Sequence, residues 1–273
     1  MKQLNTEKKW NIRDYAMTVG APLVGFSIVY LIDGFLDLDF SRLTKALFNL
    51  VVTSFFAFHI LPRKRGVPFG KVATGEFLHR LGIYRQENLG GHVLLGVILG
   101  ALSLSGMLVG SMLSGLYVFD PSTIDVSQIV FSVNPGLWEE LFYRGVLMVL
   151  LIRDTKSVRS AALIQVIIFS VFHVKGFDLW SLVDVFSVSI LALGFTYTAY
   201  KTRSLIPGIL YHFLHDAFIF VVQVPCEVAL SNTQNAVFFF SLWVAVGVGC
   251  LVTKVSAEWF GVQEKEELYK NVS

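Results

Sequence analysis

Long apolar runs separated by short polar segments constrain this chain more than any other feature. A helix needs about 17–25 predominantly apolar residues to cross a bilayer. Eight runs approach or exceed the lower limit, near residues 16–32, 44–61, 92–118, 128–152, 160–174, 181–200, 205–222 and 236–253. Only 15% of the residues are charged, whereas a soluble domain carries about 25%. The sequence therefore predicts an all-α, polytopic transmembrane helical bundle of about eight spans.

The chain has no internal repeat and no linker-like boundary, so we expect one membrane-embedded domain over residues 1–273, with its polar motifs within residues 128–222. The run at 16–32 lacks a clear cleavage site and is interpreted as an uncleaved first span. A cleaved signal peptide is the alternative.

The placement of lysine and arginine predicts the orientation. With the N-terminus inside, all but four of the 22 basic residues fall on the inner side; the exceptions are Arg42, Lys45, Arg144 and Lys175. Because basic residues concentrate in cytoplasmic loops, we expect both termini in the cytoplasm. The protein would lie in a cell membrane, or in the endoplasmic reticulum of a eukaryote. The inner segment 62–91 mixes aromatic, aliphatic and basic residues and suits an amphipathic helix on the inner leaflet; an ordinary basic loop is the alternative.

Charge and cysteine content exclude several classes. A net charge of +2 gives no indication of nucleic-acid binding. Cys226 and Cys250 are the only cysteines and lie far apart in the sequence, so neither a disulfide framework nor a zinc–thiolate site is expected.

Two adjacent carboxylates and an arginine interrupt the apolar run from 129 to 152. An ionisable group in the middle of a span costs about 2.5–3.5 kcal/mol on insertion scales, so such groups indicate function. On a regular helix Glu140 and Arg144 are one turn apart and can form an ion pair. Glu139 would face about 100° away and remain available for another partner.

Three further polar side chains lie at a comparable depth. At about 1.5 Å per residue, Glu139, Glu140 and His173 lie roughly 20 Å from the cytoplasmic ends of their spans. His212 and Asp216 lie about 12 and 18 Å into theirs, one turn apart on one face. We therefore expect three helices to bring these groups together, although each histidine alone could be a helix-bridging hydrogen-bond partner and the Glu140 ion pair could be structural.

The other histidines are assigned no chemistry. We expect His59, His92 and His215 to be interfacial or packing residues and His79 to lie on the surface.

A carboxylate and a neutral imidazole flanking one water molecule can activate it for attack on a carbonyl. Glu139 and His173 suit this role. A second histidine can stabilise the developing oxyanion, for which we assign His212 with Asp216.

Other chemistries and classes remain open. Ser170 and Ser187 are available as nucleophiles, but the chain has no Gly-x-Ser-x-Gly motif. A zinc site could use the same carboxylates and histidines, although no His-Glu-x-x-His is present. The rival classes are a non-catalytic membrane scaffold or immunity protein and a proton-coupled transporter.

At these residues the chain resembles the CAAX-protease and bacteriocin-processing family of intramembrane glutamate proteases. The motifs that carry the resemblance are Glu139-Glu140 with Arg144, Phe169 with His173, and His212 with Asp216. The resemblance implies an endopeptidase without a cofactor that acts on a peptide or prenylated-protein substrate. It implies Glu139 or Glu140 as the base, His173 as its partner, and His212 with position 216 at the oxyanion.

Position 216 departs from the family pattern, because the prenyl-protein branch is described with asparagine there. An ionised aspartate cannot donate a hydrogen bond, so Asp216 would act in protonated form or by orienting His212. We prefer Glu139 as the base because Arg144 can occupy Glu140.

Overall fold

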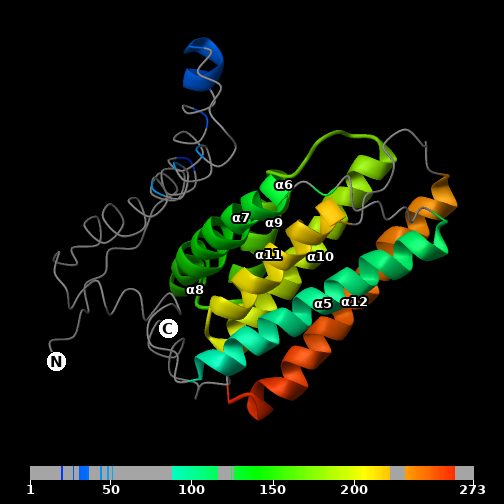
Figure 1. The fold of residues 1–273 in the computed structure, drawn as a ribbon. Helices are drawn as coiled ribbons and strands as arrows, with labels where there is room; N and C mark the ends of the chain where they lie inside the picture. The colour runs from blue at the N-terminus through cyan, green and yellow to red at the C-terminus, as the bar shows by residue number, and fades with distance from the viewer. Residues whose placement is uncertain are drawn as a thin grey trace, which may run out of the picture.

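The computed structural model describes residues 88–115, 124, 126–221 and 231–261, and residues 20, 27, 31–36, 44, 48 and 51. All elements in its continuous ranges are helices, which confirms the all-α prediction. In chain order they are α5 (Leu89–Leu113), α6 (Val126–Phe131), α7 (Val133–Glu139), the π-helix η3 (Glu140–Leu147), α8 (Met148–Thr155), α9 (Val158–Val171), α10 (Leu179–Thr202), α11 (Ile206–Val221) and α12 (Asn232–Trp259) (Figure 1).

Several predictions fall outside the described residues. They concern the spans at 16–32 and 44–61, of which only single positions and residues 31–32 are described, and the amphipathic segment 62–91 up to residue 87. His59, His79 and Cys226 also lie outside.

Three described helices, α5, α10 and α12, are long and apolar enough to cross a membrane, with mean hydropathies of 2.2, 1.8 and 2.2. They correspond to the predicted spans at 92–118, 181–200 and 236–253. The helix α9 is shorter, with 14 residues, or about 21 Å at 1.5 Å per residue. The predicted total of eight spans therefore stays a prediction.

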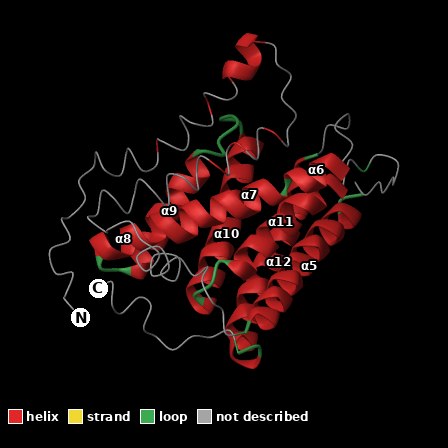
Figure 2. Ribbon diagram, turned by 60° about the vertical axis from the view of Figure 1, so that its left-hand side comes forward, coloured by secondary structure: helices red, strands yellow, loops and turns green. Residues whose placement is uncertain are grey.

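The helices form a layered bundle. Figure 2 shows α7, α8 and α9 on one side and α5 and α12 on the other, with α10 and α11 between them. Glycines on α5 allow close contact with both neighbours: a Cβ at Gly100 would lie 2.5 Å from Leu214 Cδ1 on α11, and one at Gly106 would lie 2.5 Å from Ala245 Cβ on α12. Such small residues let membrane helices approach closely without a polar contact.

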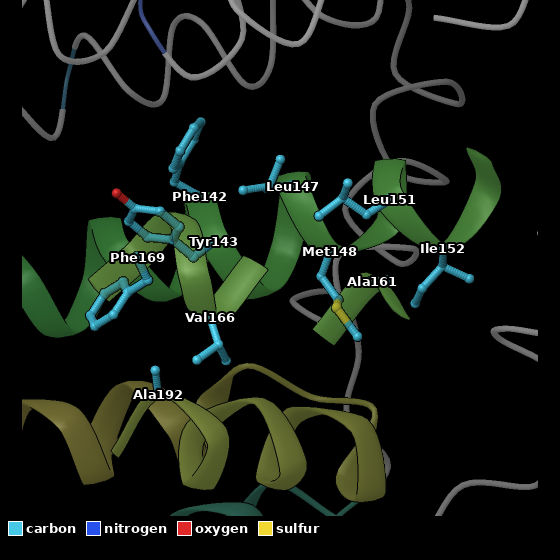
Figure 3. Packing of buried hydrophobic residues seen from close by; sticks show 10 residues of the cluster. All are labelled: Phe142, Tyr143, Leu147, Met148, Leu151, Ile152, Ala161, Val166, Phe169 and Ala192. Atoms are coloured by element: carbon cyan, nitrogen blue, oxygen red, sulfur yellow. The ribbon is translucent and has the colours of Figure 1, made fainter. Parts of the chain in front are cut away.

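A hydrophobic cluster joins η3 and α8 to α9 and α10. Figure 3 shows its ten buried residues, Phe142, Tyr143, Leu147, Met148, Leu151, Ile152, Ala161, Val166, Phe169 and Ala192. Phe169 and Tyr143 meet edge to face, with ring centroids 4.9 Å apart. This packing fixes η3 against α9, the helix that carries His173 just beyond its C-terminal end.

N-terminal caps fix the starts of two of the three long helices, α10 and α12. Asp178 accepts hydrogen bonds from the Trp180 and Ser181 amides at the start of α10. Ser231 and Gln234 form a capping box at the start of α12. These bonds satisfy amides that would otherwise lack intrahelical partners.

Candidate active site

The two glutamates lie at a change of helix type. Glu139 is the last residue of α7, and Glu140 is the first residue of the π-helix η3. The regular α-helix predicted for this segment is therefore wrong from Glu140 to Leu147, which form a π-helix. Widened turns of this kind occur frequently at functional sites. The predicted ion pair nevertheless forms, with Glu140 Oε1 3.0 Å from Arg144 Nη1.

Two glycines let α11 approach the glutamates. A Cβ at Gly136 would lie 2.9 Å from the Phe213 amide nitrogen, so α7 and α11 touch backbone to backbone at that point. A Cβ at Gly208 would lie 3.2 Å from Glu140 Oε2, so this glycine makes room for the carboxylate. The missing side chains therefore bring α11 within reach of both glutamates.

Arg144 is held in an aromatic clamp. Its guanidinium carbon lies 4.4 Å from the Phe169 ring centroid and 5.2 Å from that of Phe195. Its Nη2 donates to the Ala192 carbonyl at 3.5 Å. A desolvated cation over aromatic faces gains about 2 kcal/mol or more, so these contacts and Glu140 together compensate for the burial of the charge.

His212 lies at the centre of the site. Its Nδ1–H donates to Glu140 Oε1 at 2.8 Å, which leaves Nε2 directed toward two other carboxylates. That nitrogen is 3.9 Å from Glu139 Oε2 and 3.7 Å from Asp216 Oδ2. Phe195 stacks on the ring at 4.6 Å with an interplanar angle of 17°. The imidazole is therefore fixed in both position and orientation.

The carboxylates differ in access. The Glu140 side chain is 0% exposed, whereas those of Glu139 and Asp216 are 12% and 24% exposed. Glu139 Oε2 and Glu140 Oε2 are buried without a hydrogen-bond partner. Unpartnered carboxylate oxygens are costly to bury, so both are available to bond a polar group that enters the site, and Glu139 is the more accessible of the two.

His173 lies beside this cluster. Its Nδ1–H donates to the Phe169 carbonyl at 2.8 Å, so in the neutral ring Nε2 is an acceptor. The Phe169 ring contacts both histidines, with its centroid 4.5 Å from that of His173 and 6.4 Å from that of His212. The imidazole within 4 Å of Glu139 is that of His212. The shared water predicted for Glu139 and His173 stays a prediction.

The serines considered as nucleophiles have other partners. Ser170 accepts from Ser189 at 2.7 Å, and Ser187 accepts from Trp243 Nε1–H at 2.9 Å. Neither bond involves a histidine.

Three residues to which the sequence assigned no chemistry have other surroundings or partners. His92 and His215 are buried and bond to Asn88 and Ser103 respectively, and Cys250 is a free thiol. Within the described ranges, no group of three or more His, Cys, Asp or Glu side chains is arranged to hold a metal ion.

Phe195, Gly136 and Gly208 contribute to the site but were not predicted from the sequence. The glycines carried a signal, since a glycine inside a helical pattern indicates close backbone approach. Phe195 carried none, because one phenylalanine among many apolar residues of a span is not distinctive.

The fold and the site define a class, an all-helical membrane protein with carboxylates and an imidazole converging inside the bundle. Residues 122–218 match the family model of type II CAAX prenyl endopeptidase Rce1-like proteins. This match agrees with the resemblance seen in the motifs, and the matched segment contains every candidate catalytic residue. No curated protein and no solved structure matches the chain significantly.

Proposed function

We propose that this protein is an intramembrane endopeptidase in which Glu139 activates a water molecule for attack on a peptide carbonyl. The observation that carries the proposal is the buried Glu139 oxygen without a partner, 3.9 Å from His212 Nε2. A water bonded to this oxygen would lie where a general base must hold it, close to the imidazole that the mechanism assigns to the oxyanion.

The glutamates take different roles in this mechanism. Glu140 accepts from His212 and pairs with Arg144, so it serves to orient the imidazole. Glu139 has no such bond and is the more exposed of the two. It would take a proton from the water as the oxygen bonds to the carbonyl carbon. When the C–N bond breaks, the same proton passes to the leaving nitrogen.

The histidines would act on the two oxygens of the reaction. Nε2 of His173 can accept a hydrogen bond from the second hydrogen of the water. This bond would direct a lone pair of the water oxygen at the carbonyl carbon. His212, protonated at Nε2, would donate to the oxyanion, and Asp216 at 3.7 Å would orient and balance that imidazolium. The mechanism needs no metal ion.

The substrate we propose is a prenylated CAAX protein, from which the enzyme would release the C-terminal tripeptide. The support is the family match, whose description names CAAX prenyl endopeptidases. The basic inner segments place both termini in the cytoplasm in this proposal, so the substrate would enter from the cytoplasmic side or laterally from the lipid.

The test uses the purified full-length chain in liposomes with a farnesylated CAAX peptide and its unprenylated counterpart, each with and without a chelator. Mass spectrometry measures tripeptide release. We expect chelator-resistant release from the farnesylated peptide, lost in His173→Ala and Glu139→Gln. Ser105→Ala is the matched control, because Ser105 is exposed and donates to the Ala101 carbonyl of its own helix.

Two results would overturn parts of the proposal. A folded wild-type protein that releases no tripeptide refutes the prenylated substrate. If His173→Ala and Glu139→Gln also lower the melting temperature, the results favour a non-catalytic membrane scaffold. Release abolished by chelator and restored by zinc refutes the metal-free mechanism.

A further inference from the structure

A second buried histidine lies on the helix that carries His212 and takes no part in the mechanism above. His215 Nδ1 and Ser103 Oγ are 2.7 Å apart, both residues are buried, and the bond joins α11 to α5. We propose that the Ser103–His215 hydrogen bond is a positioning contact that fixes the rotation of α11 and thereby directs His212 and Asp216 at the glutamates. The inference rests on the proposed function.

The position of His215 on α11 suits this role. Successive residues of an α-helix are about 100° apart, so His215 lies about 60° from His212 and about 100° from Asp216. A rotation that moves one of these side chains must therefore move all three. The bond to Ser103 resists such a rotation from the side that faces α5.

The other α5–α11 contacts give less directional restraint. A Cβ at Gly100 would meet the Leu214 side chain, and one at Gly96 would meet Leu210 and Pro207. Apolar surfaces in contact permit small rotations, whereas a hydrogen bond weakens steeply as its angle departs from linearity. Gly96 and Gly100 thus allow α5 and α11 to approach closely, and the Ser103–His215 hydrogen bond restrains the rotation of α11.

Catalysis requires an accurate position of His212 relative to both glutamates. His212 contacts Glu140 at 2.8 Å and lies 3.9 Å from Glu139. A displacement of about 1 Å at a catalytic group can cost about 100-fold in rate. We therefore expect Ser103→Ala to lower kcat by about tenfold to 100-fold, with KM and melting temperature close to those of the wild type.

The experiment compares Ser103→Ala with Ser103→Thr, which keeps the hydroxyl, and with Ser105→Ala on the same helix. A kcat restored by Ser103→Thr supports the positioning role. Wild-type kcat in Ser103→Ala overturns it. A lower melting temperature with unchanged kcat per folded molecule also overturns it, because the bond would then be structural only.

A spectroscopic measurement separates this inference from the proposed function. In protein with nitrogen-15-labelled histidine, the Nδ1 signal of His212, assigned by its loss in His212→Asn, reports the bond to Glu140. The signal should shift in Ser103→Ala and return in Ser103→Thr. If the wild type cleaves no peptide, the proposed function fails. The His212 Nδ1 signal then tests the positioning role by itself, and an unchanged signal in Ser103→Ala refutes that role.

Discussion

Removing the buried cation beside Glu140 should destabilise the fold strongly. Arg144 and Glu140 are both 0% exposed and lie 3.0 Å apart. Arg144→Met keeps a long apolar side chain but leaves the Glu140 carboxylate without its guanidinium partner. Breaking a buried ion pair from one side costs about 3–5 kcal/mol. This loss of free energy of unfolding includes the loss of the guanidinium contacts with Phe169 and Phe195. Glu140→Gln should also destabilise the fold, because it leaves the guanidinium unpaired.

The double variant distinguishes this reasoning from simple loss of packing. Arg144→Met with Glu140→Gln contains no unpaired charge at this point, so it should be more stable than the sum of the single variants predicts. We expect a coupling free energy of about 1–3 kcal/mol.

The assay is unfolding in mixed detergent micelles, followed by tryptophan fluorescence. Lys175→Met is the matched control: it removes the cation of an ion pair of 3.1 Å, but that side chain is 77% exposed, and exposed pairs contribute about 0–1 kcal/mol. An Arg144→Met variant as stable as Lys175→Met would refute the reasoning. Additive effects in the double variant would attribute the loss to packing.

Three further outcomes are expected. Gly208→Ala adds a Cβ 3.2 Å from Glu140 Oε2, so kcat should fall about tenfold through a small displacement without unfolding; wild-type kcat would contradict this. Hydrogen bonds from the Ser181 hydroxyl and amide lower the pKa of Asp178, so the cap of α10 should persist at neutral pH and weaken as the pH falls through that pKa. Hydrogen exchange of the first-turn amides should then quicken in acid, and an exchange pattern matching that of Asp178→Ala at every pH would disprove it. Cleavage should survive dialysis against a chelator, and its loss with recovery on adding zinc would argue for a metal.

The helices were predictable because each apolar run is a local signal. The runs at 181–200 and 205–222 correspond to α10 and α11 within about two residues at each end. The Glu140–Arg144 pair was predictable for the same reason, since partners four residues apart meet on one helix. Depth along each span predicted that the polar groups of three helices would meet, and the structure brings His212 of α11 beside Glu139 and Glu140.

The details of the site depend on contacts that the sequence does not encode locally. The π-helix at Glu140 changes the direction of the side chains after Glu139, and no propensity rule predicts where it begins. The proximity of His212 to both glutamates depends on how closely α11 approaches at Gly136 and Gly208. The rotation of a helix and its distance from its neighbours depend on tertiary packing. The residue spacing of a motif does not predict them.

The central claim is that Glu139, and not the neighbouring Glu140, takes the proton from water. The direct test is kcat for the farnesylated peptide in Glu139→Gln, measured beside its free energy of unfolding. We predict that kcat falls by about 100-fold or more, as expected for loss of a general base. Stability should stay within about 1 kcal/mol of the wild type, because His212 keeps its contacts with Glu140 and Asp216. Cleavage near the wild-type rate in a folded Glu139→Gln protein would contradict the account.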